Sequence, residues 1–330
     1  MALPFRIATF NLENFDDKPG QKPTLDERIA LMRDQLLRLR ADILCFQEVN
    51  GQERTDQPRQ LLALDQLVSG TAYAGFFRIS TMLADGSQVF DERNLVIFSR
   101  FPIQESHHLK HDYAPAPRYR PVSAIPPETM DQEITWERPI QYAKLQLSST
   151  RTLHLIHLHL KSRLASNIRG QKLDSYRWKS ASGWAEGYFV SSMKRVGQAL
   201  ETRLLIDSIF DQEAEALIVV CGDFNAEPGE VPVEAICGAV ENTGNGTLAG
   251  RVLVPCEQSI PESSRYSLYH RGQGRLLDHM LISRKLLGAF RHAEIHNELL
   301  HDESSAGGSD RNFPESDHAP FVAEFEWPSS

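Results

Sequence analysis

Cysteine is scarce in this 330-residue chain, which has four cysteines and no CxxC pair. Cys45 and Cys221 fall inside predicted buried strands, while Cys237 and Cys256 have no partner at metal-ligand spacing. Structural zinc sites need closely spaced Cys and His ligands, and disulfide frameworks need many cysteines in a short chain. We therefore expect reduced thiols and no zinc site.

Long apolar runs, short-period repeats and low-complexity tracts are also absent from the sequence. No stretch reaches the 18 apolar residues typical of a membrane-spanning helix, and residues 1–10 lead into a predicted strand without a signal-peptide pattern. We expect a cytoplasmic protein with no integral membrane contact. A surplus of positive charge is missing too, since the formal net charge is -9. Tight, sequence-blind binding of duplex nucleic acid is thus disfavoured, although a locally basic groove is compatible with this charge.

The most informative stretch is Leu217–Pro228, with the sequence LIVVCGDFNAEP. Its first five residues are apolar and mostly β-branched, which predicts a strand buried on both faces. Asp223 and Asn225 follow after Gly222, and residues two apart on an extended segment point to the same side. A carboxylate and a carboxamide would then project together from a strand end, where they can hold a metal or a water. An ordinary turn is the alternative, because Asp and Asn are turn formers.

Other polar residues stand at the ends of predicted apolar strands. Asn11 follows the strand predicted at 5–10, and Glu48 follows the strand predicted at 43–46. Between these strands, Thr24 with Glu27 forms a capping-box pattern that predicts the start of an amphipathic helix. Polar residues at three strand ends predict a cleft at one edge of a sheet.

Histidines and further carboxylates lie in the second half of the chain. The alternating stretches 140–147 and 152–160 predict an antiparallel hairpin in which His157 and His159 share a face. Asp278 and His279 interrupt the apolar strand predicted at 276–283, where Asp278 could instead be a strand-end cap. We expect His279 to be structural and His157 to be a core residue or a support for the site.

Residues 161–195 form a basic and aromatic arm, with eight Lys or Arg residues against two acidic ones. Basic side chains among aromatic ones can hold a phosphate-bearing or stacked ligand. The candidate substrate-binding residues of this arm are Lys161, Arg163, Arg177, Trp178 and Arg195. The alternative is a solvated arm whose aromatic residues pack on the body of the protein.

Seven motifs in order resemble the endonuclease/exonuclease/phosphatase superfamily, which includes pancreatic-type deoxyribonucleases, apurinic endonucleases, inositol polyphosphate 5-phosphatases and neutral sphingomyelinases. They are NLENF at 11–15, QE at 47–48, NLVIFSRFPI at 94–103, HLKS at 159–162, GDFNAEP at 222–228, LDHMLIS at 277–283 and SDHAP at 316–320. The resemblance implies a four-layer α/β/β/α sandwich (class α/β, or α+β) with two mixed, mainly antiparallel sheets. It also implies one domain over residues 1–330, with the active site where loops from both sheets meet.

The resemblance assigns metal and phosphate ligands by position. Glu48 matches the principal Mg²⁺ ligand, Asn11 lies beside it near metal and phosphate, and Asp317 matches an acidic residue near the metal. Asp223 and Asn225 match the pair that positions the attacking water and binds the phosphate. Mn²⁺ is a possible substitute for Mg²⁺ at such oxygen ligands.

The resemblance also assigns a catalytic pair and a second histidine. His318 matches the histidine at the scissile phosphate, and Asp278 matches the carboxylate that orients it. His159 matches the second phosphate-facing histidine of the deoxyribonuclease branch, in which a Glu corresponding to Glu92 pairs with it. The alternative is that Glu92 is a charged surface residue and does not pair with His159.

The implied reaction is Mg²⁺-dependent hydrolysis of phosphodiester bonds, with Asp/His-assisted attack of water on phosphorus. The general base stays open between Asp and an Asp–His pair. A nuclease-like activity is the first expectation, with nucleic acid as a candidate substrate. The alternatives are a phosphatase or phosphodiesterase on a small or lipid-derived phosphoester, and a catalytically inactive binding module. Asn94 stands in a strand where apurinic endonucleases carry a tyrosine, which disfavours DNA-repair specificity. We take a monomer as the default.

Overall fold

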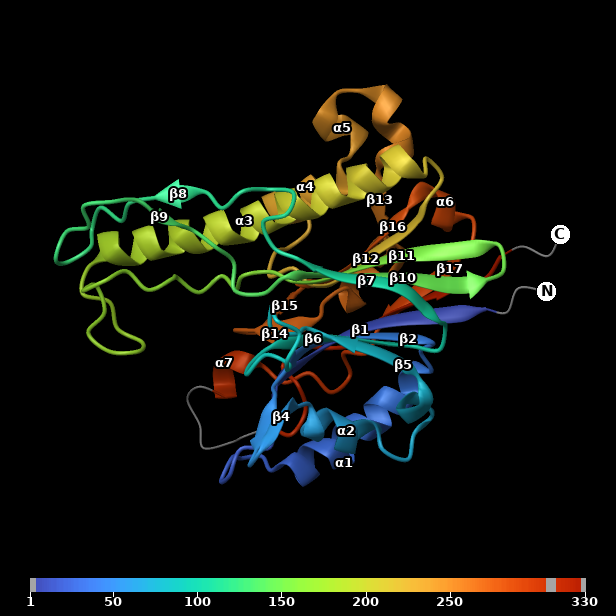
Figure 1. Cartoon of the computed structure of the whole chain (residues 1–330), viewed down its shortest axis with the longest axis horizontal. Coiled ribbons are helices and arrows are strands. Elements are labelled where there is room, and N and C mark those ends of the chain that lie inside the picture. The colour runs from blue at the N-terminus through green and yellow to red at the C-terminus, as the bar shows by residue number, and fades with distance from the viewer. Residues whose placement is uncertain (1–3, 307–312, 328–330) are drawn as a thin grey trace.

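The computed structural model of the chain describes residues 4–306 and 313–327. Within these residues, two six-stranded sheets stack face to face, and helices cover both outer faces (Figure 1). The layers follow the order helix, sheet, sheet, helix. This arrangement confirms the α/β/β/α sandwich expected from the sequence motifs.

The first sheet contains the N-terminal strands and the C-terminal strand. In spatial order its strands are β17 (Phe290–Ile295), β18 (Phe321–Phe325), β1 (Phe5–Phe15), β2 (Ile43–Val49), β6 (Asn94–Ser99) and β5 (Phe77–Ser80). β1 and β2 run parallel, whereas the other neighbours in this sheet are antiparallel. The sheet is therefore mixed and mainly antiparallel, as expected.

The second sheet comes from the middle of the chain. In spatial order its strands are β13 (Leu253–Pro255), β16 (Asp278–Ser283), β12 (Leu217–Asp223), β11 (Arg151–His159), β10 (Ile140–Ser148) and β7 (Ile103–Leu109). β11 and β12 are parallel, and the remaining neighbours are antiparallel. Three short hairpins lie outside the sheets: β3 (Gln52–Arg54) with β4 (Gln57–Gln60), β8 (Arg118–Tyr119) with β9 (Gln132–Glu133), and β14 (Leu268–His270) with β15 (Gln273–Arg275).

Helices pack on the outer face of each sheet. The first sheet is covered by α1 (Leu25–Leu39) and α2 (Leu62–Val68), and the second by α3 (Ala181–Gln212) and α4 (Val231–Cys237) (Figure 1). Short helices complete the chain: α5 (Val240–Thr243), α6 (Arg284–Leu287) and α7 (Glu303–Ala306). The capping box at Thr24 and Glu27 is present at the start of α1, as its sequence predicts.

Alternation along β12 shows how the layers are held together. Val219 and Cys221 pack between the sheets, whereas Ile218 and Val220 pack against the helices on the other face. The strand is buried on both faces, as its apolar sequence predicts. All four cysteines are buried and unpaired. Among the described residues, no helix is long and apolar enough to cross a membrane.

The predicted arm at 161–195 consists of two different structures. Residues 161–180 form an irregular loop, and residue 181 begins the 32-residue helix α3, whose first half extends beyond the sheets (Figure 1). This part of α3 packs with the loops through a small cluster that contains Ala124, Ile134, Ile168 and Val190. The arm therefore depends on residues from the 104–139 region, which the sequence did not connect with it.

Gly222 makes possible the close pairing of β11 with β12. Its φ is +136°, and a Cβ placed on it would lie 1.9 Å from the carbonyl oxygen of Leu158. We expect Gly222→Ala to lower the free energy of unfolding by roughly 2–4 kcal/mol, because the two backbones would have to separate. Urea denaturation measures this change.

Gly250→Ala is the matched control, because a Cβ at Gly250 meets nothing within 4 Å. We expect it to change stability by less than about 0.5 kcal/mol. Equal denaturation midpoints for the two variants would contradict the packing described for Gly222.

Candidate active site

Strand register brings the predicted site residues to one edge of the sandwich, which we call the site edge. In the second sheet, His159 pairs in register with Asp223, and Asp223 pairs with Asp278 on the other side. In the first sheet, Asn11 and Glu48 lie on the parallel neighbours β1 and β2. Parallel strands end at the same edge of a sheet, so residues far apart in the sequence meet there.

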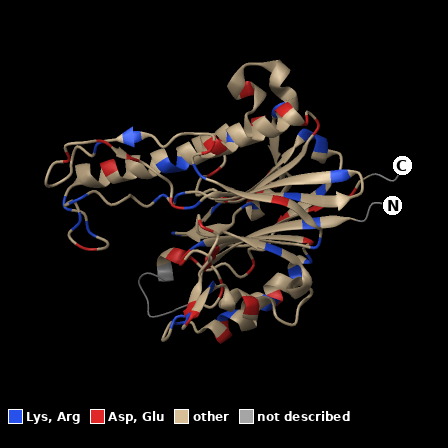
Figure 2. Ribbon diagram, in the orientation of Figure 1, with Lys and Arg blue, Asp and Glu red and all other residues tan. Residues whose placement is uncertain are grey.

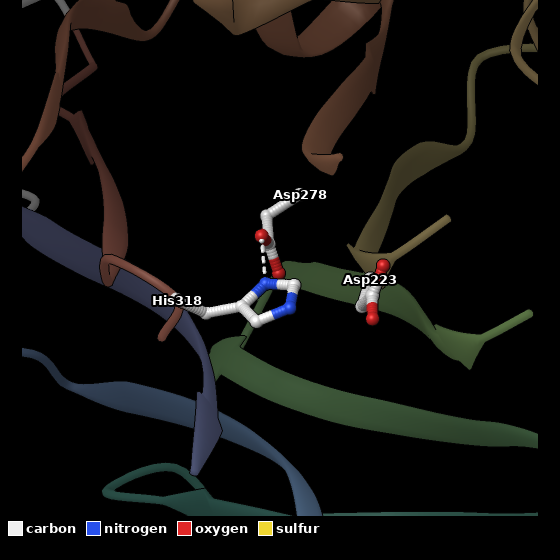
Figure 3. A group of neighbouring side chains, drawn as sticks. All are labelled: Asp223, Asp278 and His318. Carbon is white, nitrogen blue, oxygen red and sulfur yellow. Dashed lines mark hydrogen bonds and ion pairs between the residues drawn. The ribbon is translucent and has the colours of Figure 1, made fainter. Parts of the chain in front are cut away.

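His318 and Asp278 form a buried ion pair at this edge. The Nδ1 atom of His318 lies 2.7 Å from Oδ2 of Asp278, and both side chains face Asp223 (Figure 3). Burial disfavours the imidazolium, but the charge and hydrogen bond of Asp278 outweigh it and raise the pKa of His318 well above its usual value. His318 is thus held as a cation with a fixed ring orientation.

Two buried serines hold this pair in place. The Ser316 hydroxyl donates to the Asn11 carbonyl at 2.7 Å and accepts from the His318 N–H at 3.1 Å. The backbone N–H of Asp278 donates to the Ser267 hydroxyl at 3.1 Å. These bonds tie the segment before β18 to β1, and the start of β16 to the loop before β14.

Asp223 is the acceptor for two carboxamides. Its Oδ2 accepts from Nδ2 of Asn11 at 3.1 Å and from Nδ2 of Asn225 at 3.0 Å. Burial raises the pKa of Asp223 to about 7; the charge of His318 lowers it, while those of Asp278 and Glu48 raise it. A carboxyl group with this pKa can exchange a proton near neutral pH.

Asn225 reaches Asp223 by a different geometry from the one expected. The chain leaves β12 after Asp223, and Asn225 adopts a left-handed conformation with φ of 49°. Its backbone N–H donates to Oδ1 of Asp223 at 2.8 Å. The alternation of an extended strand therefore does not explain the pairing. A tight turn after the strand folds the amide back onto the carboxylate.

Three further carboxylates, Glu13, Glu48 and Asp317, gather where β1 and β2 end. Burial raises the pKa of Asp317 to about 6; the charge of His318 lowers it, and that of Glu48 raises it. Burial and the charge of Asp317 raise the pKa of Glu13 to about 7. The buried Arg28 compensates this group only in part, since its guanidinium donates to the backbone oxygens of Glu13 and Leu12.

A divalent cation fits this carboxylate group. Buried carboxylates that repel one another are stabilised by a cation, and Mg²⁺ prefers hard oxygen ligands. Among the described residues, however, the three groups whose ligand atoms all lie within 4.8 Å of one another are Asp223, Asp278 and His318, and not these three carboxylates. In that group, Nδ1 of His318 is already engaged with Asp278. The reason to keep Glu48 and Asp317 as the candidate cation ligands is chemical, since Mg²⁺ prefers hard oxygen ligands.

His159 joins the site, whereas Glu92 does not. Nε2 of His159 lies 3.4 Å from Oδ2 of Asp223 and 3.5 Å from Oε1 of Glu48, and its Nδ1 has no partner among the described residues. Glu92 is 54% exposed and pairs with Lys18 at 3.5 Å. The expected pairing of Glu92 with His159 is therefore not formed, because the residues that enter β6 turn the Glu92 side chain outward.

His157 and His279 have structural surroundings. His157 is fully buried between the sheets and contacts Gln47 and Gln141; burial lowers its pKa to about 3. His279 contacts Oε1 of Glu257 at 2.6 Å and the Ala226 carbonyl at 2.8 Å.

The basic residues predicted on the arm have mixed surroundings. Arg163 pairs with Glu227 and Glu230, and Arg195 donates to the backbone oxygens of Lys161 and Ser162. Figure 2 shows acidic and basic residues interspersed along the arm.

At the tip of the arm, Arg177 pairs with Asp174, and the Trp178 ring lies under the ammonium of Lys172. Of the four basic residues among the five, Lys161 and Arg195 have no carboxylate within 4.0 Å in the described part of the chain, and Lys161 follows His159 by two residues.

Sequence reasoning missed Glu13, Arg28 and Arg138. Glu13 lies inside the NLENF motif, but its side chain joins the carboxylate group only because Glu13 and Asn14 adopt left-handed conformations. Arg138 is buried at the end of β11, where Nε donates to the His159 carbonyl at 3.0 Å and Nη2 to the Leu160 carbonyl at 2.9 Å. No periodicity in the sequence marks this contact, since Arg138 comes from the segment before the neighbouring strand β10.

Fold and site together define a metal-dependent hydrolase of phosphoesters. The sequence profile of the Endonuclease/Exonuclease/phosphatase family matches residues 8–318. The chain belongs to this family, whose members are metal-dependent phosphoester hydrolases. No curated protein matches the sequence.

Solved structures agree on the fold. A truncated Caenorhabditis elegans TDP2 has a TM-score of 0.58 at 14% identity, with 98% of each chain covered. The Neisseria 3′ phosphatase NExo, bound to a product DNA hairpin, has a TM-score of 0.51 at 19% identity, covering 98% of this chain and 100% of that one. The human nocturnin catalytic domain with bound sulfate gives 0.52 at 19% identity, covering 98% and 94%.

The His318–Asp278 pair can be tested by titration. We expect Asp278→Asn to lower the pKa of the His318 imidazole toward its ordinary value near 6.5, because the carboxylate that stabilises the cation is removed. Since the folded pKa is raised, the pair contributes stability below pH 6.5 and loses it as pH rises through the folded value. NMR of labelled histidine measures this, with Asp174→Asn on the exposed arm as the control. Identical titration of His318 in both variants would rule out the proposed coupling.

Proposed function

We propose that this protein hydrolyses phosphodiester bonds in a Mg²⁺-dependent, nuclease-like reaction in which water attacks phosphorus. The observation that carries the proposal is the placement of the His318–Asp278 pair opposite Asp223, beside the carboxylates at the ends of β1 and β2. A phosphodiester is anionic, so its hydrolysis requires positive charge at the phosphate and a group that accepts a proton from water.

Glu48 and Asp317 would hold the cation, with the Asn11 carboxamide beside them. A divalent cation at this position supplies positive charge at the phosphate oxygens. The oxygen ligands suit Mg²⁺, and Mn²⁺ could replace it at the same ligands.

Asp223 is suited to orient water and accept its proton. Its pKa of about 7 matches a base that works near neutral pH. Asn11 and Asn225 fix the rotation of this carboxylate by donating to it. The second N–H of Asn11 is available to a phosphate oxygen that enters the site, whereas that of Asn225 donates to the Leu160 carbonyl at 3.1 Å.

His318 would stabilise the charge that develops on the phosphate. Asp278 keeps the imidazole protonated and leaves Nε2–H directed away from the ion pair. His159 is a neutral imidazole, because burial and the charges of Arg138, His318 and Arg93 lower its pKa well below the usual value. Its Nε2 approaches Asp223 and Glu48, where it can donate to the phosphate.

Phosphatase or phosphodiesterase activity on a small or lipid-derived phosphoester is the second candidate. One observation favours it. Three of the predicted substrate-binding residues of the arm, Arg163, Arg177 and Arg195, already contact carboxylates or backbone oxygens of the chain. A long polyanion would have to compete with those partners. Among the similar structures, NExo is described as a 3′ phosphatase.

A substrate panel separates the two candidates. It contains single- and double-stranded DNA, RNA, bis-p-nitrophenyl phosphate, p-nitrophenyl phosphate, inositol phosphates and sphingomyelin, each with Mg²⁺, Mn²⁺ or EDTA. We expect metal-dependent turnover of polynucleotide and bis-p-nitrophenyl phosphate. Turnover confined to small or lipid phosphoesters, with no cleavage of polynucleotide, would favour the second candidate.

Three substitutions test the assigned residues. We expect Asp223→Ala, His318→Ala and Glu48→Ala each to lower kcat by about 100-fold or more without unfolding, because each removes charge used at the phosphate. Asp174→Ala, on the exposed arm, is the control. Near-normal turnover by a folded His318→Ala variant would refute the role of that residue.

Metal binding can be measured without substrate. We expect Glu48→Gln to weaken Mn²⁺ binding in calorimetry by about tenfold or more, because a carboxylate ligand is replaced by a neutral amide. Glu92→Gln is the matched control: it removes one charge from an exposed Glu that pairs with Lys18. Equal weakening in both variants would mean that general electrostatics, and not ligation, determines affinity.

A further inference from the structure

Three basic side chains lie beside His159 and belong to no part of the reaction described above. Arg93 immediately precedes β6, which is antiparallel to β2 and so begins near Glu48. Arg138 precedes β10, which is antiparallel to β11 and so begins near His159. Lys161 follows the end of β11. Topology therefore brings all three to the site edge from three strands.

None of the three has an acidic partner. In residues 4–306 and 313–327, no carboxylate lies within 4.0 Å of the basic nitrogen atoms of Arg93, Arg138 or Lys161. On the arm, Arg163 and Arg177 form ion pairs, whereas Arg195 contacts only backbone oxygens. What sets Arg93, Arg138 and Lys161 apart is that all three lie at the site edge and none has a carboxylate within 4.0 Å in the described part of the chain.

Arg138 is the most unusual member because it is only 5% exposed. A buried cation without a paired anion is costly. Two of its nitrogens donate to backbone carbonyls at the end of β11, which leaves Nη1 without a hydrogen-bond partner in the described part of the chain. The acidic residues that most favour its charge, Glu48, Glu137 and Asp223, include two that we assign to metal and water.

The three cations are close enough to repel one another. Burial lowers the pKa of Lys161, and although Glu137 opposes this, the charges of Arg138, Lys194 and Arg93 lower it further. Arg93 likewise lowers the pKa of Arg138 and of His159. Like charges gathered without a carboxylate in ion-pair contact favour an anionic ligand.

Hydrogen bonds hold two of these residues in position. Arg93 has a left-handed conformation, with φ of 60°, and its N–H donates to Oδ1 of Asn50 at 2.9 Å. The Asn50 side chain in turn donates to the buried Asp16 at 3.1 Å. The Lys161 ammonium donates to the Ser162 hydroxyl at 2.9 Å. A non-glycine residue keeps such a conformation only where its surroundings fix it.

We propose that Arg93, Arg138 and Lys161 form a second anion subsite, which binds a further phosphate of a substrate that carries at least two phosphate groups. The inference rests on the proposed function, since the scissile phosphate occupies the site between Asp223 and His318. The same chemistry fits the neighbouring phosphate of a nucleic-acid strand and the second phosphate of a small bisphosphate. Guanidinium and ammonium groups both bind phosphate, and arginine does so through two parallel hydrogen bonds.

Calorimetry with two pairs of probes tests the subsite without catalysis. One pair is thymidine 3′,5′-bisphosphate and thymidine 5′-monophosphate; the other is inositol 1,4-bisphosphate and inositol 1-phosphate. We expect the wild-type protein with Mg²⁺ to bind the bisphosphate of at least one pair about tenfold or more tightly than its monophosphate. The pair that shows this gain identifies a nucleotide or a small bisphosphate as the source of the second phosphate.

The variant is Arg93→Gln with Lys161→Gln, which leaves the structural contacts of Arg138 in place. The control is Lys285→Gln, an exposed cation paired with Glu215 beyond the other end of β16. We expect the double variant to lose the bisphosphate gain and the control to retain it, with circular dichroism showing that both are folded. The subsite would be overturned if the folded double variant still bound the bisphosphate more tightly than the monophosphate. It would also be overturned if the wild-type protein bound neither bisphosphate more tightly than its monophosphate.

Hydrolysis measured in parallel separates this inference from the proposed function. If the bisphosphate gain depends on Arg93 and Lys161 but no phosphoester is hydrolysed, the subsite stands and the proposed reaction fails. If bis-p-nitrophenyl phosphate, which has one phosphate, is hydrolysed and no gain is seen, the reaction stands and the subsite fails.

Discussion

Strand register is the constraint on which the site depends. β12 lies between β11 and β16, so Asp223 has His159 on one side and Asp278 on the other. A shift of one residue would turn each side chain to the opposite face of the sheet. Gly222 permits the close contact between β11 and β12 directly before Asp223. The central strand thus sets the distances on which the proposed chemistry relies.

Charge is divided unequally along the site edge. Near the ends of β1 and β2, burial raises the pKa values of Glu13 and Asp317, and neighbouring carboxylates raise them further. Beside His159, Arg93 and Arg138 provide positive charge without acidic partners. A metal ion bound by the carboxylates would neutralise their charge, and phosphate groups bound beside the metal and beside Arg93 and Arg138 would neutralise the cations. The two proposals therefore concern neighbouring halves of one electrostatic arrangement.

Much of the fold could be predicted from the sequence, because apolar strands that end in polar residues leave a clear local pattern. β12 is buried on both faces as its apolar run predicts, and the capping box starts α1 where Thr24 indicates. The convergence of Asn11, Asp223 and His318 followed from their positions at strand ends together with the family resemblance. These features depend on residues that are close together in the sequence, so a local pattern is enough to reveal them.

The features that escaped prediction depend on conformation or on distant strands. Asn225 reaches Asp223 through a left-handed turn, which the extended-strand argument did not foresee. Glu92 turns outward to Lys18, although its position in the motif suggested a contact with His159. Arg138 contacts the end of β11 from the segment that precedes the neighbouring strand β10. Side-chain direction after a strand end is a tertiary property, and hydrophobic periodicity carries no signal for it.

The most direct test of the central claim is the position of a bound cation in crystals soaked with Mn²⁺, located by anomalous diffraction. Our account predicts a peak coordinated by the carboxylates of Glu48 and Asp317, with the hydrogen bond between His318 and Asp278 intact. A peak coordinated by His318 and Asp278 would contradict it, because the imidazolium proposed to stabilise the phosphate would then be a metal ligand.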